Sequence, residues 1–172
     1  MSPVYKVPVQ DRSLYLFIRG NPTIPDHHGL YIHQSGDSGK EFHARNIGFG
    51  WVKEIGVTHG FPETMAMIFL LRLGSISEER ISSFELVVDR IAVRPHDPTF
   101  NCIVWVREAM EARIKEGFIT LRDEKDVNDI LEEARLSSRA MRDSVMDGTQ
   151  QPQAIPLWEI IPGRRPGFPR YQ

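Results

Sequence analysis

The first half of the chain has the hydrophobic and polar spacing of β-strands. Strands are predicted, from alternating or β-branched and aromatic residues, over residues 4–10, 13–20, 29–34, 40–48, 49–58 and 64–74. Between two of them, the segment "SGDSG" at 35–39 is typical of a hairpin turn. The pattern therefore indicates an antiparallel sheet.

The second half changes to a spacing of three and four residues between apolar positions, which predicts helices. They are expected over residues 77–93, 101–117 and 122–148. Ser77, Asn101 and Asp123 are suitable N-caps for the three helices, and Gly117 is a suitable stop for the second. An antiparallel sheet followed by helices is an α+β fold, with the sheet packed on the helices.

A chain of 172 residues is long enough for one domain with a sizeable core. We expect a single domain over residues 1–148. The proline-rich segment 149–172 is expected to be an extended tail that docks on the domain or covers it as a lid.

Composition and charge exclude several classes of protein. The formal net charge of -2 gives no basic face for nucleic acid. Arg72 interrupts the most apolar run after about eight residues, whereas a membrane span needs about 20. One cysteine excludes an internal disulfide, and no signal-peptide pattern begins the chain. We therefore expect a cytoplasmic protein with a reduced thiol.

That single thiol, Cys102, is predicted to lie in the first turn of a helix. Unpaired N–H groups and partial positive charge at a helix N-terminus favour a thiolate, and a nearby imidazolium favours it further. The same N–H groups, positioned by Asn101, could hold an oxyanion. Cys102 is thus a candidate nucleophile with a lowered pKa; the alternative is a small buried hydrophobic side chain.

Four of the six histidines lie within residues 26–43. His27 and His43 are placed near the open ends of the predicted hairpin, where side chains on adjacent strands lie about 5 Å apart. His27 is therefore a candidate general base, and His43 a candidate for orienting its imidazole. Alternation puts His28 on the apolar face, but a shifted register would make it the base instead. His33 is expected to be solvated.

A metal site is not predicted. Imidazoles bind zinc, but the sequence has no neighbouring cysteine and no helical histidine pair. We expect a site that needs no metal and no cofactor.

Together, "HHGLYIH…EFH" and "NCIVWVREAM" resemble the circularly permuted papain-like superfamily, an NlpC-type fold. This group includes the lecithin–retinol acyltransferase-like proteins and the PPPDE peptidases. The resemblance implies that His27 and His43 match the two family histidines and that the pair Asn101 and Cys102 matches the Asn-Cys motif. His28 stands where the family usually has a tryptophan.

From these residues and this resemblance we expect a thiol-dependent hydrolase or acyltransferase that acts on an amide, peptide or (thio)ester carbonyl. The partner would be a small-molecule or peptide substrate, with no nucleic acid and no membrane span. A different class remains open, namely a papain-like module that binds a protein or small molecule without catalysis.

Overall fold

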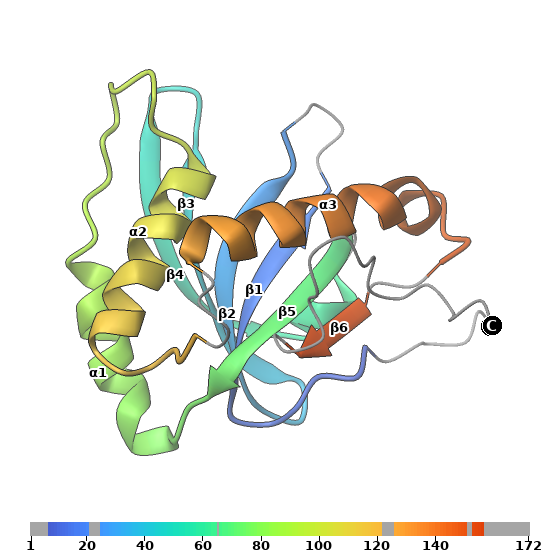
Figure 1. Ribbon diagram of the computed structural model, residues 1–172, viewed down its shortest axis with the longest axis horizontal. Coiled ribbons are helices and arrows are strands. Elements are labelled where there is room, and N and C mark those ends of the chain that lie inside the picture. The colour runs from blue at the N-terminus through green and yellow to red at the C-terminus, as the bar shows by residue number, and fades with distance from the viewer. Residues whose placement is uncertain (1–6, 21–24, 65, 122–125, 151–152, 157–172) are drawn as a thin grey trace.

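The structure is a computed structural model that describes residues 7–20, 25–64, 66–121, 126–150 and 153–156 (Figure 1). Its strands are β1 (Ser13–Arg19), β2 (His27–Ser35), β3 (Ser38–Asn46), β4 (Trp51–His59), β5 (Met67–Ser75) and β6 (Gln153–Pro156). Its helices are the short 3-10 helix η1 (Phe61–Glu63), α1 (Glu78–Asp89), α2 (Cys102–Lys115) and α3 (Val127–Met146). The α+β class expected from the sequence is confirmed.

The strands form a single sheet in the order β4-β3-β2-β1-β5-β6. The pairs from β4 through to β5 are all antiparallel, and β6 joins β5 in parallel. Figure 1 shows α2 and α3 lying across the same face of the sheet, where they cover its central strands. The predicted antiparallel sheet packed on helices is therefore present.

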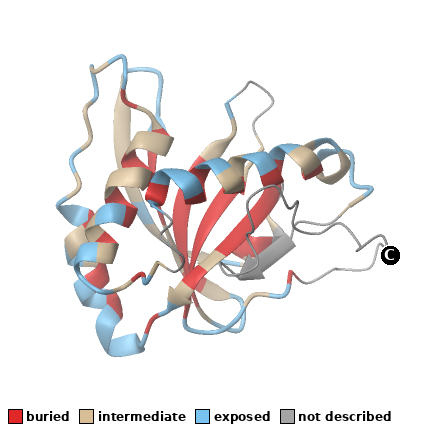
Figure 2. Ribbon diagram, viewed as in Figure 1, coloured by how far each residue is buried: buried red, intermediate tan, exposed pale blue. Residues whose placement is uncertain are grey.

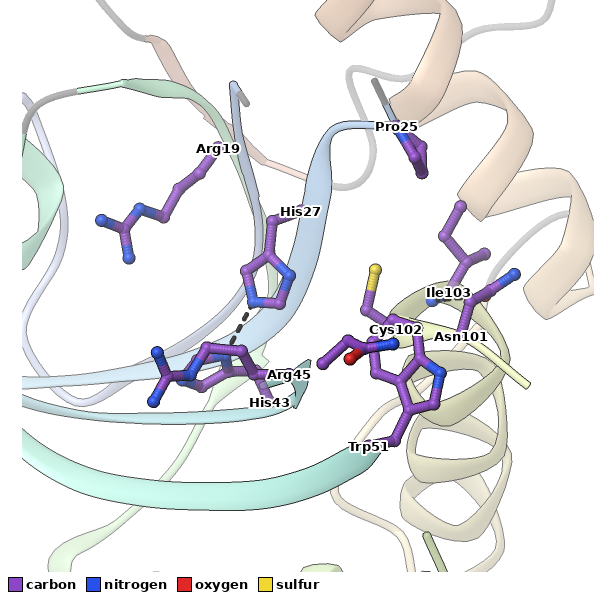
Figure 3. A pocket seen from close by; sticks show the side chains of 10 residues that line it. Arg19, Pro25, His27, His43, Arg45, Trp51, Asn101, Cys102 and Ile103 are labelled. Carbon is purple, nitrogen blue, oxygen red and sulfur yellow. Dashed lines mark hydrogen bonds between the residues drawn. The ribbon is translucent and has the colours of Figure 1, made fainter. Parts of the chain in front are cut away.

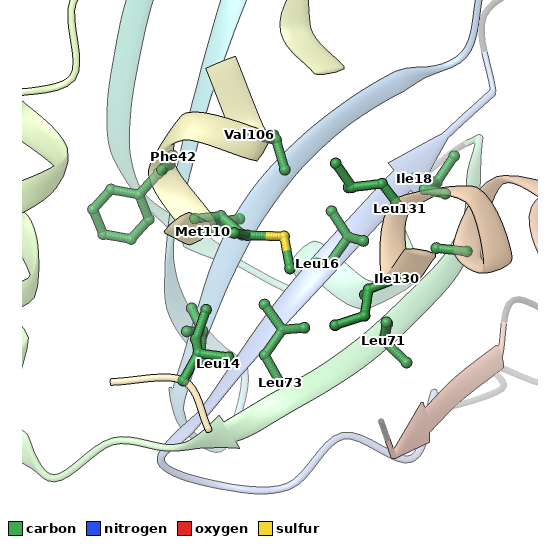
Figure 4. Close-up of a cluster of buried hydrophobic side chains, with 14 of the residues drawn as sticks. Leu14, Leu16, Ile18, Phe42, Leu71, Leu73, Val106, Met110, Ile130 and Leu131 are labelled. Atoms are coloured by element: carbon green, nitrogen blue, oxygen red, sulfur yellow. The ribbon is translucent and has the colours of Figure 1, made fainter. Parts of the chain in front are cut away.

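Alternation along β1 sends its side chains into two separate apolar clusters. Leu14, Leu16 and Ile18 face the helices, where they join Met110 of α2 and Ile130 of α3 in the main core (Figure 4). The sheet lies behind these helices as a largely buried layer, while the outer sides of the helices are exposed (Figure 2).

On the opposite face of the sheet, Tyr15 and Phe17 pack against Tyr31 and Phe61 in a smaller cluster. This second cluster lies beneath the row of polar side chains that forms the candidate site, because Phe17 also contacts the rings of His27 and His43.

Several predicted element boundaries differ from the structure. Residues 7–10 of the expected first strand are not a strand, and Pro8 explains part of this because it has no N–H to donate to a ladder. Helix α1 ends at Asp89 instead of extending to residue 93. The N-cap of α3 is Asp126, which forms a capping box with Asp129; the predicted cap, Asp123, lies outside the described residues.

Part of the segment assigned to the C-terminal tail lies on the sheet. Residues 153–156 form β6 beside β5. The rest of the expected tail after residue 156 lies outside the described residues.

Gly29 in β2 allows β1 and β3 side chains to approach each other closely. A Cβ at Gly29 would lie 2.4 Å from Phe17 Cζ and 2.9 Å from His43 Cβ. The absence of a side chain there therefore lets Phe17 pack under the β2–β3 pair and sets the position of His43.

We predict that Gly29→Ala lowers the free energy of unfolding by about 2 kcal/mol or more, in the upper part of the range for overpacked sites. The matched control is Gly74→Ala in β5, where a Cβ meets only Phe118 O, at an ordinary 3.6 Å. Urea unfolding of both variants measures the difference. Equal small effects in the two variants would contradict the tight packing at Gly29.

Candidate active site

A pocket of about 500 Å³ opens where the start of β2, the end of β3 and the N-terminus of α2 meet (Figure 3). It is lined by Arg19, Pro25, His27, His43, Arg45, Asn46, Trp51, Asn101, Cys102 and Ile103. The structure thus brings together the candidate nucleophile, both histidines matched by the resemblance, and the capping asparagine.

The two pocket histidines are in direct contact. His27 Nε2 lies 2.6 Å from His43 Nδ1, and the rings meet at 73°. His27 begins β2 and His43 lies near the end of β3, so the contact runs across adjacent strands. Figure 3 shows the other nitrogen of His27 on the side of the ring that faces the Cys102 sulfur.

Glu54 of β4 extends this row of side chains. It pairs with His43 in the β3–β4 register, and its Oε2 lies 3.3 Å from His43 Nε2. The distance is that of an ion pair, although the angle does not meet hydrogen-bond geometry. A carboxylate there favours a proton on His43 Nε2, which leaves His43 Nδ1 to accept from His27 Nε2. His27 Nδ1 is then the basic nitrogen.

The helix N-terminus holds Cys102 in place. Asn101 is the N-cap of α2, and its Oδ1 accepts hydrogen bonds from the N–H groups of Ile103 at 2.9 Å and Val104 at 3.0 Å. These two groups are therefore occupied. The N–H of Cys102 itself lies in the first turn and has no intrahelical acceptor, so it is the group available to an oxyanion.

The prediction of a lowered thiol pKa is wrong for this structure. Cys102 is only 4% exposed, and burial raises the pKa of its thiol. Backbone N–H groups of His28, Cys102 and Ile103 act in the opposite direction but do not outweigh the burial. The sequence showed the helix N-terminus but not how completely the sheet would cover the sulfur.

Burial also keeps the two imidazoles neutral. It lowers the pKa of His27 to about 3, and the charge that His43 acquires when it is protonated in acid and the charge of Arg19 lower this pKa further. It lowers the pKa of His43 to about 4, against the opposing effect of Glu54. The resting site is therefore a neutral thiol beside a neutral imidazole pair.

The remaining histidines of the cluster do not line this pocket. His28 is buried, its Nδ1 lies 3.1 Å from Asp26 O, and it is not among the lining residues. His33 was expected to be solvated, and that prediction is wrong: it is 3% exposed, and Tyr31 Oη lies 2.9 Å from its Nδ1.

Sequence reasoning missed three charged side chains of the site: Glu54, Arg19 and Arg45. Each follows from strand register, since Arg19 is directly opposite His27, Glu54 is opposite His43, and Arg45 lies two residues beyond His43 on the same face. Alternation within each predicted strand gave the faces, but the pairing between strands was needed to place these side chains together.

None of the described helices has both the length and the apolar character needed to cross a membrane. A protein-family model matches residues 14–120, and it is described as a family of unknown function (DUF6540). No curated protein and no solved structure matches the chain. The matched segment contains every charged or nucleophilic residue of the pocket and ends before α3.

We predict that His43 makes the protein less stable in mild acid. The unfolded chain binds a proton at His43 near pH 6.5, whereas the folded chain does so only near pH 4, so stability falls as the pH falls between these values. From pH 7 to pH 5 the loss from this group reaches about 2 kcal/mol. His43→Gln should lose correspondingly less stability over that interval, measured by urea unfolding at both pH values.

The control for this prediction is His59→Gln, because the His59 side chain is 67% exposed. It should keep the pH dependence of the wild type. If His43→Gln and the wild type lose the same stability on acidification, His43 is not held neutral by burial.

Proposed function

This chain belongs to DUF6540, a family of unknown function, and we propose from the chemistry of its site that it is a thiol-dependent hydrolase or acyltransferase. The substrate is an amide, peptide or (thio)ester carbonyl compound. The observation that carries the proposal is the row from Glu54 through His43 and His27 toward Cys102, with a 2.6 Å contact at its centre.

In the first half of the reaction, His27 Nδ1 accepts the thiol proton of Cys102 and the sulfur attacks the substrate carbonyl carbon. The oxyanion that forms lies at the N–H of Cys102. The bond from the carbonyl carbon to the leaving nitrogen, oxygen or, in a thioester, sulfur then breaks, and His27 gives its proton to the leaving group. An S-acyl bond to Cys102 remains.

In the second half, water or an acceptor nucleophile gives a proton to His27 and attacks the acyl carbon. The carbon–sulfur bond breaks, and the thiol recovers its proton from His27. His43 holds the His27 ring in the required tautomer throughout, and Glu54 does the same for His43.

The fold proposed with this reaction is the circularly permuted papain-like one. Two features support it: the order of histidine on β2, histidine on β3 and cysteine at the start of α2, and the antiparallel sheet packed on that helix. The reaction needs no cofactor. A reduced thiol fits a cytoplasmic location.

A second candidate is a papain-like module that binds a small molecule or protein without catalysis. The burial of Cys102 and the raised pKa of its thiol favour it, because a buried neutral thiol is the usual state of an inert cysteine. The pH dependence of alkylation separates the two candidates.

We predict that the rate of Cys102 alkylation by iodoacetamide levels off to a plateau as the pH is lowered from about pH 8 toward about pH 5, instead of falling about tenfold for each pH unit. The thiolate–imidazolium form has the same net charge as the neutral pair, so its population does not fall with the pH and it becomes the main reactive form at the acid end of that interval. In His27→Ala the rate should instead rise about tenfold for each pH unit, as the thiolate fraction does.

His59→Ala is the matched control because it replaces an exposed histidine, and the plateau in the Cys102 alkylation rate should remain in this variant. His28→Ala should also keep it while lowering the unfolding midpoint, because His28 is buried outside the pocket. A wild-type rate that follows the thiolate fraction and is unchanged by His27→Ala would favour the binding module.

A further inference from the structure

Two arginines, Arg19 and Arg45, are the charged groups that line the pocket. Its described lining contains no aspartate or glutamate. Since His27 and His43 are neutral at pH 7, the guanidinium groups give the pocket a net positive charge. The potential inside a partly closed cavity of this kind favours a negatively charged ligand.

Arg19 is the arginine with a free guanidinium. Arg45 is paired with Glu54 through its Nη2. Arg19 instead has its guanidinium carbon 5.7 Å from the centre of the Phe61 ring and forms no ion pair with any described carboxylate. A guanidinium resting on an aromatic ring keeps its N–H fork available for a carboxylate.

Glu41 is a carboxylate that interacts electrostatically with Arg19. It lies on β3 on the face that carries His43, and the two side chains interact electrostatically without reaching ion-pair distance. Burial raises the pKa of Glu41, and its Oε2 has no hydrogen-bond partner. Glu41 therefore does not neutralise the charge of Arg19 through a direct ion pair.

The place of Arg19 relative to the reacting groups defines which part of the substrate it contacts. Arg19 is directly opposite His27 in the β1–β2 register, and Figure 3 shows it on the side of His27 away from Cys102. In the proposed reaction, His27 gives its proton to the leaving group, so the leaving group lies on the His27 side of the scissile bond. A substituent that extends past His27 reaches Arg19.

We propose that Arg19, assisted by Arg45, binds a carboxylate on the leaving group of the substrate, which makes the site selective for amides or esters of acidic leaving groups such as amino acids. This inference rests on the proposed function. Arg19 is then a specificity residue, whereas His27 and Cys102 carry out the reaction.

Matched alkylating reagents test the proposal. N-iodoacetyl-glycine carries a carboxylate, and N-iodoacetyl-glycinamide is its neutral counterpart; the corresponding β-alanine pair extends the reach by one carbon. The rates of Cys102 alkylation are measured at pH 7 and 150 mM salt, where the Debye length of about 8 Å screens distant charges. The readout is the alkylation rate with the carboxylate reagent divided by the rate with its neutral amide counterpart. This ratio for the folded protein is then divided by the same ratio for the urea-unfolded chain.

In the wild type, this relative ratio should be about ten for the glycine pair or the β-alanine pair of reagents, as expected for a guanidinium–carboxylate contact. Arg19→Gln should reduce it to about one, and because the ratio is taken within each variant, any change in the amide rate caused by the lost charge near His27 cancels. Arg90→Gln removes the same charge from an exposed arginine at the C-cap of α1, which does not line the pocket, and should keep the wild-type ratio.

Two results would overturn the inference: a wild-type ratio of one at both lengths, or an equal loss in Arg19→Gln and Arg90→Gln. Failure of the proposed function would be seen separately, with the neutral reagent alone. The rate of Cys102 alkylation would then follow the thiolate fraction and would not change in His27→Ala.

Discussion

The site depends on the register of four neighbouring strands, β1 to β4, and on a glycine in β2 that lets side chains of β1 and β3 approach each other. Arg19 is paired with His27 across β1 and β2, and His43 with Glu54 across β3 and β4. Gly29 leaves the space in which Phe17 and His43 approach each other. A slip of one residue in any of these pairings would turn the polar row toward the opposite face, into the apolar core against the helices. The packing of that core therefore fixes the geometry of the histidines.

Burial determines the charge state of the row more than the individual charges do. Desolvation is the first cause of the pKa shifts of Cys102, His27 and His43, and it disfavours the charged form of each. Helix α2 still contributes partial positive charge at Cys102, but that effect is small when the sulfur is covered. In the proposed reaction the proton must therefore move from the thiol to the imidazole, because a preformed ion pair is not the resting state.

The sequence predicted those features that depend on local pattern. The alternation in β1 to β5, the cap at Asn101 and the opposite orientations of His27 and His28 could be read from short stretches. Features that depend on pairing between distant segments could not be predicted: the position of Glu54 opposite His43, the parallel addition of β6 to β5, and the burial of His33. The direction of the Cys102 pKa shift belongs to this second group, since it follows from how the sheet covers the helix N-terminus.

The arginines connect the electrostatics of the site to the proposed binding of a substrate carboxylate. The positive charges of Arg19 and Arg45 both lower the pKa of His27, so in the empty pocket they oppose transfer of the thiol proton to its imidazole. A carboxylate bound at Arg19 offsets that charge and makes the imidazolium less unfavourable. It also displaces water from the pocket, which strengthens the attraction between imidazolium and thiolate. A substrate with a negative leaving group would in this way favour the ion pair that attacks it, whereas a neutral molecule would meet the resting thiol.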